Sequence, residues 1–366
     1  DIGSIPAQSS LDRPTPFLFN QSIYLYHVGP DGDQSIYSTV SNPFVDPNLS
    51  QAFGSSLEGI GDFNGDGFDD YAVLAPGFTS LAYFFDFNGS EFPNNQGALY
   101  IYYGSSSAAQ LSTPDLLLAP EYVTNPTGTG VVELTEFSAI GDVNGDGYDD
   151  IAIASPSTSI DSDTTQDGLV YIAFGGPNWG STNSGAITMF DLNQLSKNQS
   201  NSTSDDFSSY GFVIEGLPAA RAGISLDGGG DMNGDGLADF MIGAPGDNDN
   251  LSYTLMGSDF TSTINQSGTI GDDVMEGSST GERFLGNQGD DQIDTNGGID
   301  VAYAGPGSDV VSVSDTYFLR LDGGPGADAL LFEGYNGQSW DLTTLAPGSR
   351  LRNFEFWMTT NYGANT

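Results

Sequence analysis

The sequence predicts an all-β protein built from two kinds of repeat, one after the other. Short alternating runs rich in Tyr, Phe, Val and Ile recur between clusters of Gly, Asn, Asp and Ser, and helical periodicity is nearly absent. One acidic segment occurs three times before residue 258, and a nine-residue period follows from about residue 268. Repeats of this kind indicate small β-units that bury their apolar faces against their neighbours.

The charge balance indicates a folded body that needs cations. The 366 residues carry 49 Asp and Glu against 7 Lys and Arg, a formal net charge of −42. A disordered acidic tail does not fit, because 37% of the residues are hydrophobic and 12% are aromatic. We expect no nucleic-acid partner and no insertion into a membrane, since phosphate binding needs a basic surface and no long apolar stretch occurs.

Two residue counts exclude several kinds of chemistry. The chain has no Cys, so disulfides and thiolate metal sites are absent, and bound calcium is the expected replacement. His27 is the only histidine, which excludes a His-based zinc site and a Ser-His-Asp triad. A paired-carboxylate site stays open, because 49 acids cannot be sorted from sequence alone.

The first repeat is a strand, an acidic loop and two further strands. Its three copies begin at Gly61, Gly141 and Gly230, and strands are expected at 23–27, 71–75, 99–103, 151–154, 170–174 and 240–243. The intervals between the three starting glycines are similar, and their length suits a propeller blade with insertions.

Oxygen-bearing side chains alternate along each acidic loop, which predicts calcium binding. Calcium takes six to eight hard oxygen ligands, and alternate residues of a tight loop converge on one centre. Gly67 supplies the backbone freedom that the turn needs, and a main-chain carbonyl is the natural extra ligand. The predicted ligands are Asp62, Asn64, Asp66, Phe68 and Asp70; Asp142, Asn144, Asp146, Tyr148 and Asp150; and Asp231, Asn233, Asp235, Leu237 and Asp239.

An EF-hand is the nearest alternative for these loops. It requires a Glu at loop place twelve, where this chain has Val73, Ile153 or Ile242. The pattern D-x-N-x-D-G-x-x-D followed by an apolar strand instead resembles the FG-GAP repeats of integrin α-subunit β-propellers, over roughly residues 50–257. Of the two short sequences for which the FG-GAP repeat is named, Gly-Ala-Pro is complete only at 243–245 and Phe-Gly is clear only at 53–54. The resemblance implies three clear propeller blades and a partial blade from the first fifty residues.

The second repeat keeps its chemistry in register over nine-residue units that start at Gly268. Place eight is always apolar, at Met275, Phe284, Ile293, Ala302 and Val311. A flexible Gly/Asp-rich linker is the alternative, but linkers do not keep apolar residues in register. Place six is always acidic, and a sixth unit at 323–331 follows one residue out of phase; the acids are Asp273, Glu282, Asp291, Asp300, Asp309 and Asp328.

This tract is similar to the hemolysin-type, or RTX, calcium repeat. The resemblance implies a parallel β-roll in which place-eight side chains fill a thin core and the place-six acids bind calcium between turns. It implies the pairs Asp273 with Asp291, Glu282 with Asp300, and Asp291 with Asp309. It also implies bacterial export, followed by folding when the chain meets calcium outside the cell.

These patterns divide the chain into four parts. We expect a propeller-like domain at 1–257, a small polar linker at 258–267, an RTX-like β-roll at 268–331 and a C-terminal β cap at 332–366. In the last part, Arg350 and Arg352 stand near Phe354, Phe356 and Trp357, as in a segment that covers the open end of a repeat stack.

The functional hypothesis is a non-enzymatic, calcium-binding extracellular or cell-surface protein that recognises a protein or glycan through its propeller loops. Catalysis would need an open metal position or an acid–base pair in a cleft, and the sequence identifies neither. Two alternatives are a secreted calcium-dependent hydrolase acting on polysaccharide or phosphoester, and a subunit of a self-assembling surface layer or filament.

Overall fold

The structure is a computed structural model. It describes residues 22–28, 34–43, 52–76, 97–105, 110–120, 132–158, 166–179, 187–196, 210–246, 250–335, 340 and 350–362. Within these ranges nearly all regular structure is β-strand, beside one four-residue α-helix and two 3-10 turns. The all-β prediction is confirmed. None of the helices in this part of the chain has the length and apolar character needed to span a membrane.

The elements fall into two groups, before and after residue 258. The first group is β1 (Ser22–Val28), β2 (Gln34–Ser41), β3 (Ser56–Gly61), β4 (Asp70–Ala75), β5 (Ala98–Tyr102), η1 (Gln110–Ser112), β6 (Leu116–Ala119), β7 (Glu136–Gly141), β8 (Asp150–Ser155), β9 (Leu169–Ala173), η2 (Pro177–Trp179), β10 (Thr188–Asp191), α2 (Asn193–Ser196), β11 (Gly211–Glu215), β12 (Ser225–Gly230), β13 (Asp239–Ala244) and β14 (Leu251–Leu255). The second group is β15 (Gln266–Ser267), β16 (Val274–Glu276), β17 (Arg283–Leu285), β18 (Gln292–Asp294), β19 (Val301–Tyr303), β20 (Val310–Val313), β21 (Arg320–Asp322), β22 (Ala329–Tyr335), β23 (Leu351–Arg352) and β24 (Phe356–Tyr362).

The three acidic loops each join two antiparallel strands. Sheets run in the order β10-β6-β5-β4-β3, β11-β9-β8-β7 and β12-β13-β14, beside a separate β1-β2 hairpin. The loops connect β3 to β4, β7 to β8, and β12 to β13, so the predicted order of strand, acidic loop, strand and strand is confirmed in every copy. We call these three sheets the loop-bearing sheets.

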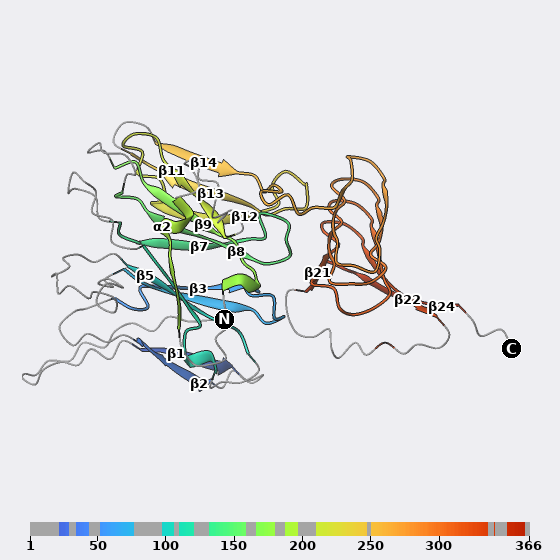
Figure 1. Ribbon diagram of the computed structural model, residues 1–366, viewed down its shortest axis with the longest axis horizontal. Helices are drawn as coiled ribbons and strands as arrows, with labels where there is room; N and C mark the ends of the chain where they lie inside the picture. The colour runs from blue at the N-terminus through green and yellow to red at the C-terminus, as the bar shows by residue number, and fades with distance from the viewer. Residues whose placement is uncertain are drawn as a thin grey trace, which may run out of the picture.

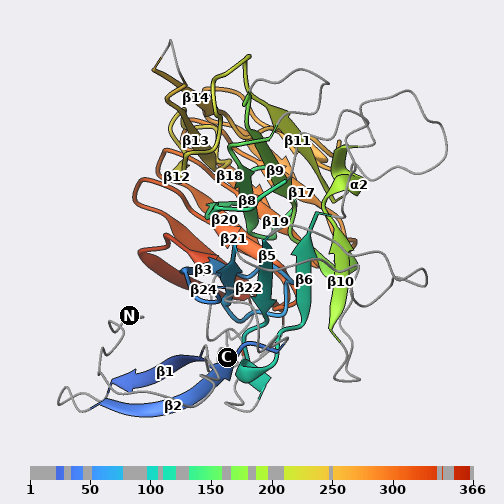
Figure 2. The ribbon, with the colours of Figure 1, turned by 90° about the vertical axis from the view of Figure 1, so that its left-hand side faces the viewer.

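The loop-bearing sheets stack face to face through apolar side chains. Alternate residues of β8 point to opposite neighbours: Ile151 and Ile153 join the core shared with β4 and β5, while Ala152 and Ala154 join the core shared with β13. The other face of the first sheet packs on Val40 of β2 and its neighbours. In Figure 2 the β1-β2 hairpin and β14 accordingly lie at opposite ends of the stack.

After residue 265 the strands form two parallel sheets, which we call the parallel-sheet region. Successive strands alternate between the orders β15-β17-β19-β21-β23 and β16-β18-β20-β22-β24. Partners within a sheet are two nine-residue units apart, as in Val274 with Gln292, until β19 and β20, whose partners lie one residue further on. The shift accommodates the sixth unit, which is one residue out of phase in the sequence. Strands β23 and β24, from the segment expected to be a cap, are the last strands of the two sheets.

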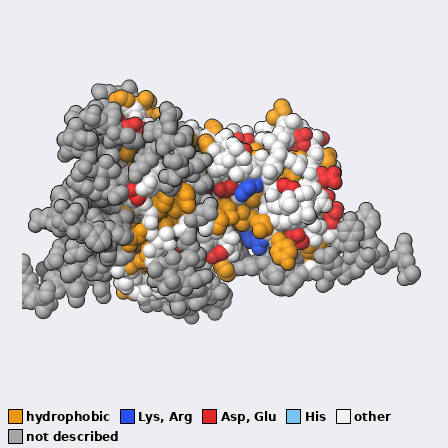
Figure 3. All heavy atoms as spheres, in the orientation of Figure 1, with side chains coloured by type: hydrophobic (Ala, Val, Ile, Leu, Met, Phe, Trp, Pro, Cys, Tyr) orange, Lys and Arg blue, Asp and Glu red, His pale blue; other side chains and the backbone are white. Residues whose placement is uncertain are grey.

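The place-eight residues form the core of the parallel-sheet region, as expected. Met275, Phe284, Ile293, Ala302 and Val311 are all buried in one cluster. Figure 1 shows this region beside the loop-bearing sheets, and Figure 3 shows the basic side chains visible on this face lying close to the junction. The two regions are joined by an apolar cluster that includes Leu237 of the third loop and Val301 of β19.

Candidate metal-binding loops and turns

The three acidic loops share one hydrogen-bonding scheme. The first Asp of each loop accepts a hydrogen bond through Oδ2 from the N–H of the glycine five residues later, at 2.9 Å from Gly67 to Asp62, 2.6 Å from Gly147 to Asp142 and 2.8 Å from Gly236 to Asp231. The Asn two places on donates to the third predicted ligand, as in Asn64 Nδ2 to Asp66 Oδ2 at 3.0 Å. The sequence repeat therefore fixes one loop conformation, three times.

The last acid of each loop ties the loop to the strands around it. Asp70 Oδ2 accepts hydrogen bonds from the N–H groups of Phe63 and Asn64, and its Oδ1 accepts one from Gly104. Asp150 and Asp239 make the same kinds of contact in the other two copies.

Two glycines in each loop have left-handed backbone angles. Gly67 has φ +88°, as its predicted role in the turn requires, and Gly65 has φ +77°. The sequence interpretation identified only the first of these positions. In the second loop the equivalents, Gly145 and Gly147, have φ +75° and +94°.

Burial leaves the carboxylates of the first two loops poorly compensated. Asp62 is 3% exposed, and its Oδ1 is buried with no hydrogen-bond partner. Burial raises the pKa of Asp62 to about 6 and the pKa of Asp70 to about 8. Burial, followed by the charge of Asp142, raises the pKa of Asp146 to about 7. A cation placed here would remove this penalty.

The predicted ligands differ in how far they are covered. In the third loop Asp231 and Asn233 are exposed, whereas the last acid, Asp239, is buried. The predicted carbonyl ligands belong to Phe68, Tyr148 and Leu237, and the side chains of the last two make different contacts. The Tyr148 ring lies against Gly65, and the Leu237 side chain packs on β17 and β19.

In the parallel-sheet region, acids from successive turns of one sheet are brought together. Asp291 Oδ1 accepts a hydrogen bond from Asp273 N at 2.8 Å, and Asp300 Oδ1 accepts one from Glu282 N at 2.8 Å. Asp309 Oδ1 accepts one from Asp291 N at 2.7 Å. The three residue pairs expected from sequence are thus adjacent, and Asp309 N donates in the same way to Asp328, across the longer step to the out-of-phase unit.

The second carboxylate oxygen is the distinctive feature of these turns. In Asp291, Asp300, Asp309 and Asp328 the Oδ2 atom is buried without a hydrogen-bond partner. Burial raises the pKa of Asp300 to about 6 and the pKa of Asp309 to about 7. Across the described ranges, however, no group of three His, Cys, Asp or Glu side chains is placed so that it could hold a metal ion. The carboxylates are instead turned onto backbone amides.

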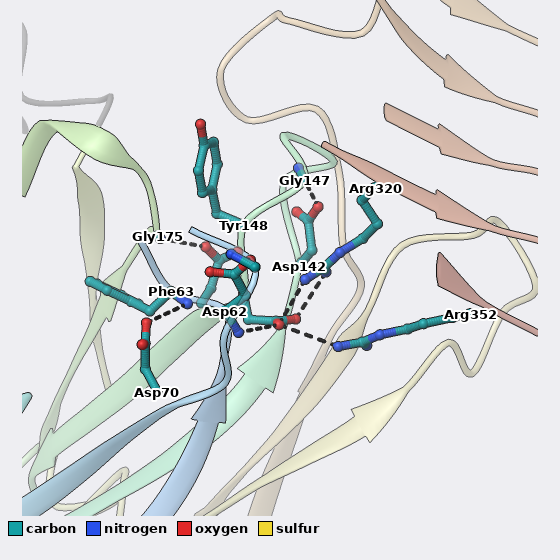
Figure 4. A network of polar contacts seen from close by, with 12 residues as sticks. Asp62, Phe63, Asp70, Asp142, Gly147, Tyr148, Gly175, Arg320 and Arg352 are labelled. Atoms are coloured by element: carbon teal, nitrogen blue, oxygen red, sulfur yellow. Dashed lines mark hydrogen bonds and ion pairs between the residues drawn. The ribbon is translucent and has the colours of Figure 1, made fainter. Parts of the chain in front are cut away.

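A buried polar network joins the loops to the parallel-sheet region, and sequence reasoning missed it (Figure 4). Its centre is Asp149, which is paired with Arg320 of β21 and Arg352 of β23. One signal was present in the sequence: place eight of the loop differs among the copies, as Asp69, Asp149 and Ala238. The other was Arg320, an arginine between two leucines in a very acidic chain.

These features define an all-β chain with repeated acidic loops between antiparallel strands. Residues 136–173 match the family model of the FG-GAP repeat, a stretch that runs from the start of β7, through the second loop, to the end of β9. The predicted similarity to FG-GAP repeats is therefore confirmed for this copy.

Several curated proteins are similar to this chain. Phosphatidylinositol-glycan-specific phospholipase D of Homo sapiens is 29% identical over 182 residues, which is 49% of this chain and 18% of that protein. Integrin alpha-PS2 of Drosophila melanogaster is 28% identical over 197 residues, 54% of this chain and 12% of the integrin. Integrin alpha-IIb of Mus musculus is 30% identical over 139 residues, 37% of this chain and 11% of the integrin. The chain thus spans less than a fifth of the length of these relatives.

Proposed function

We propose that this chain is a calcium-stabilised, non-enzymatic binding module that works outside the cell or at its surface. Three blades of the integrin α propeller type would carry recognition, and the parallel-sheet region would be an RTX-like calcium β-roll. The FG-GAP match at 136–173 and the integrin α relatives support the first part. The nine-residue period and the alternating parallel strands support the second.

The observation that carries the proposal is the set of buried carboxylate oxygens without partners. Five of these atoms belong to predicted calcium ligands: one to Asp62, and one each to four acids of the parallel-sheet turns. An unpaired buried carboxylate is costly, and a hard divalent cation is the partner that a carboxylate prefers. The residues present therefore fit calcium. When bound, the ion would neutralise neighbouring carboxylates and link turns that otherwise repel each other.

Within each loop, the carboxylates of the first, third and last predicted ligands and the amide oxygen of the second would hold the ion, with one main-chain carbonyl. In the parallel-sheet region the place-six acids of adjacent turns would hold it between them. The net charge of −42 gives the ions a further role, because each one reduces the repulsion that opposes folding.

Isothermal titration with calcium, paired with thermal unfolding in calcium and in EGTA, tests the proposal. We expect saturable binding and a melting temperature that falls in EGTA. The matched variants are Asp66→Asn, which alters a predicted ligand of the first loop, and Asp69→Asn, which alters another exposed acid of the same loop. Only the first should weaken binding. Absence of calcium binding, with equal melting temperatures in both buffers, would contradict the proposal.

The partner would be a protein or a glycan, and the bacterial origin implied by the RTX-like repeats belongs to the same proposal. Self-association into a surface layer or filament is a second form that such a module can take. Sedimentation at increasing protein concentration, with and without calcium, separates the two forms. A strict monomer in both conditions would contradict assembly.

A calcium-dependent hydrolase is the alternative function, and the observation that favours it is the similarity to a phospholipase D. Because the similarity covers 18% of that protein, the enzyme is the less favoured candidate. Turnover of a chromogenic phosphodiester or of a polysaccharide in calcium would support it, provided that the activity is abolished in EGTA.

A further inference from the structure

The second acidic loop differs from the other two in what surrounds it. Its eighth residue, Asp149, is buried, whereas the equivalent Asp69 of the first loop is exposed and the third loop has Ala238 there. All three loops nevertheless share the hydrogen bond from the glycine at place six to the first Asp. One position in the repeat has therefore been given a separate role in one copy.

Asp149 is the centre of a buried ion pair between the two regions. Arg320 donates from Nη1 to Asp149 Oδ1 at 3.0 Å and from Nη2 to Asp149 Oδ2 at 2.7 Å. The Arg320 and Asp149 side chains are 2% and 5% exposed. Arg352 Nη2 lies 3.4 Å from the same Oδ2. This two-bond geometry is the strongest form of an arginine–carboxylate contact, and its burial protects it from salt.

The same carboxylate also holds the neighbouring loop. Asp62 N donates to Asp149 Oδ2 at 2.9 Å, and Asp149 N donates to the carbonyl oxygen of Asp62 at 3.2 Å. Loss of this carboxylate would therefore loosen two loops as well as the junction. The charges of Arg320 and Arg352 outweigh the effect of burial and keep the pKa of Asp149 below its usual range.

Close packing surrounds the ion pair. The Tyr303 hydroxyl donates to Asp142 Oδ2 at 2.5 Å, across the same junction. A Cβ atom on Gly147 would lie 2.6 Å from Val301 Cγ2 and 2.8 Å from Leu319 Cδ2, so only glycine fits there. Beside these contacts a cavity of about 410 Å³ opens between the second and third loops and strands β19 and β21.

We propose that the edge formed by the second and third loops is an intramolecular docking surface, whose partner is the parallel-sheet region of the same chain. The Asp149–Arg320 pair holds the two regions so that they unfold as one unit. Neither residue of this ion pair is a predicted calcium ligand, so we expect the docking to persist in EGTA. One consequence rests on the proposed binding function: an external protein or glycan binds the loop-bearing sheets away from the second loop, which is already covered.

Calorimetry of the unmodified protein is the first test. If the two regions unfold together, the protein shows a single unfolding transition both in calcium and in EGTA, and only the temperature of that transition changes with calcium. Two separate transitions in either buffer would overturn the proposal. The number of transitions and the calcium dependence are different readouts, so a failure of the calcium proposal is distinguishable from a failure of docking.

Variants of the ion pair are the second test. Asp149→Asn and Arg320→Gln each leave one buried charge without its partner. We expect the rate of chymotrypsin cleavage next to the exposed Phe260, in the segment between β14 and β15 that connects the two regions, to rise about 100-fold or more. Asp69→Asn, the matched change in the first loop, should leave the rate unchanged. The double variant Asp149→Leu with Arg320→Met removes both charges and should restore most of the resistance.

The outcomes of the second test are distinct. Equal cleavage rates in Asp149→Asn, Asp69→Asn and the unmodified protein would overturn the proposal. If both single variants failed to fold, the double variant would still decide, because docking through the ion pair predicts that it folds better than either single variant.

Discussion

Asp309 provides a prediction whose sign changes with calcium. Its Oδ1 accepts the amide of the preceding turn, while its Oδ2 is buried with no partner, next to the charges of Asp328 and Asp291. Burial and these neighbours raise its pKa from 3.8 to about 7. The substitution Asp309→Asn keeps the acceptor oxygen and removes the charge.

The magnitude follows from the raised pKa. A rise of this size corresponds to about 4 kcal/mol at pH 8, and screening by solvent close to these thin turns reduces the figure to about 2 kcal/mol. In EGTA, Asp309→Asn should therefore stabilise the protein by about 1–2 kcal/mol. In saturating calcium the same change removes a ligand, and a tenfold weaker site should cost about 1.4 kcal/mol.

Urea denaturation at pH 8, in EGTA and in calcium, measures both values. The control is Glu276→Gln, an exposed acid of β16 in the same region, which should change stability by less than about 0.5 kcal/mol in either buffer. If Asp309→Asn destabilised the protein equally in both buffers, the carboxylate would be acting only as an acceptor for the backbone. The reasoning from buried charge would then be wrong.

Three further predictions concern pH, the core and the turns. Burial in the folded state raises the pKa of Asp70 to about 8, so the folded state binds this proton more tightly than the unfolded state does. Urea midpoints in EGTA should therefore rise as the pH is lowered from about 9 to 5, and calcium should flatten this dependence. Ile293→Ala should cost about 2–5 kcal/mol in urea unfolding because the side chain is fully buried, whereas Gln292→Ala, on the exposed face of the same strand, should cost less than about 0.5 kcal/mol. Gly307→Ala should lower the melting temperature and cost at least about 2 kcal/mol, because its Cβ would lie 1.8 Å from a backbone carbonyl oxygen of the neighbouring turn. The control is Gly271→Ala, at the same place of the repeat, which should be nearly neutral because no atom lies within 4 Å of its Cβ position.

The sequence predicted those features that depend on short-range patterns. The nine-residue period placed Phe284 and Ile293 in the core, since an apolar residue at a fixed place in every turn has to face the same way. The loop pattern placed Gly67 in a left-handed turn for a similarly local reason. Local chemistry decides both, so a single sequence was enough.

Features that join distant segments could not be predicted in this way. Asp149 and Arg320 are 171 residues apart, and nothing in either local pattern names the other as its partner. The final strand, β24, presents Phe356, Trp357 and Met358 to solvent, so it lacks the alternation of apolar and polar residues by which strands are recognised. Its place is fixed by pairing with β22 instead.

The alternation of strands between two parallel sheets restricts how the array can change in length. Partners in one sheet lie two repeat units apart, so loss or duplication of a single nine-residue unit ahead of β21 would move every later strand into the opposite sheet. Arg320 would then stand on the wrong side of the array, out of reach of Asp149. Insertion or loss of two units at a time keeps every later strand in its own sheet. In this chain the contact between Arg320 and Asp149 therefore requires that the array change in length by pairs of units.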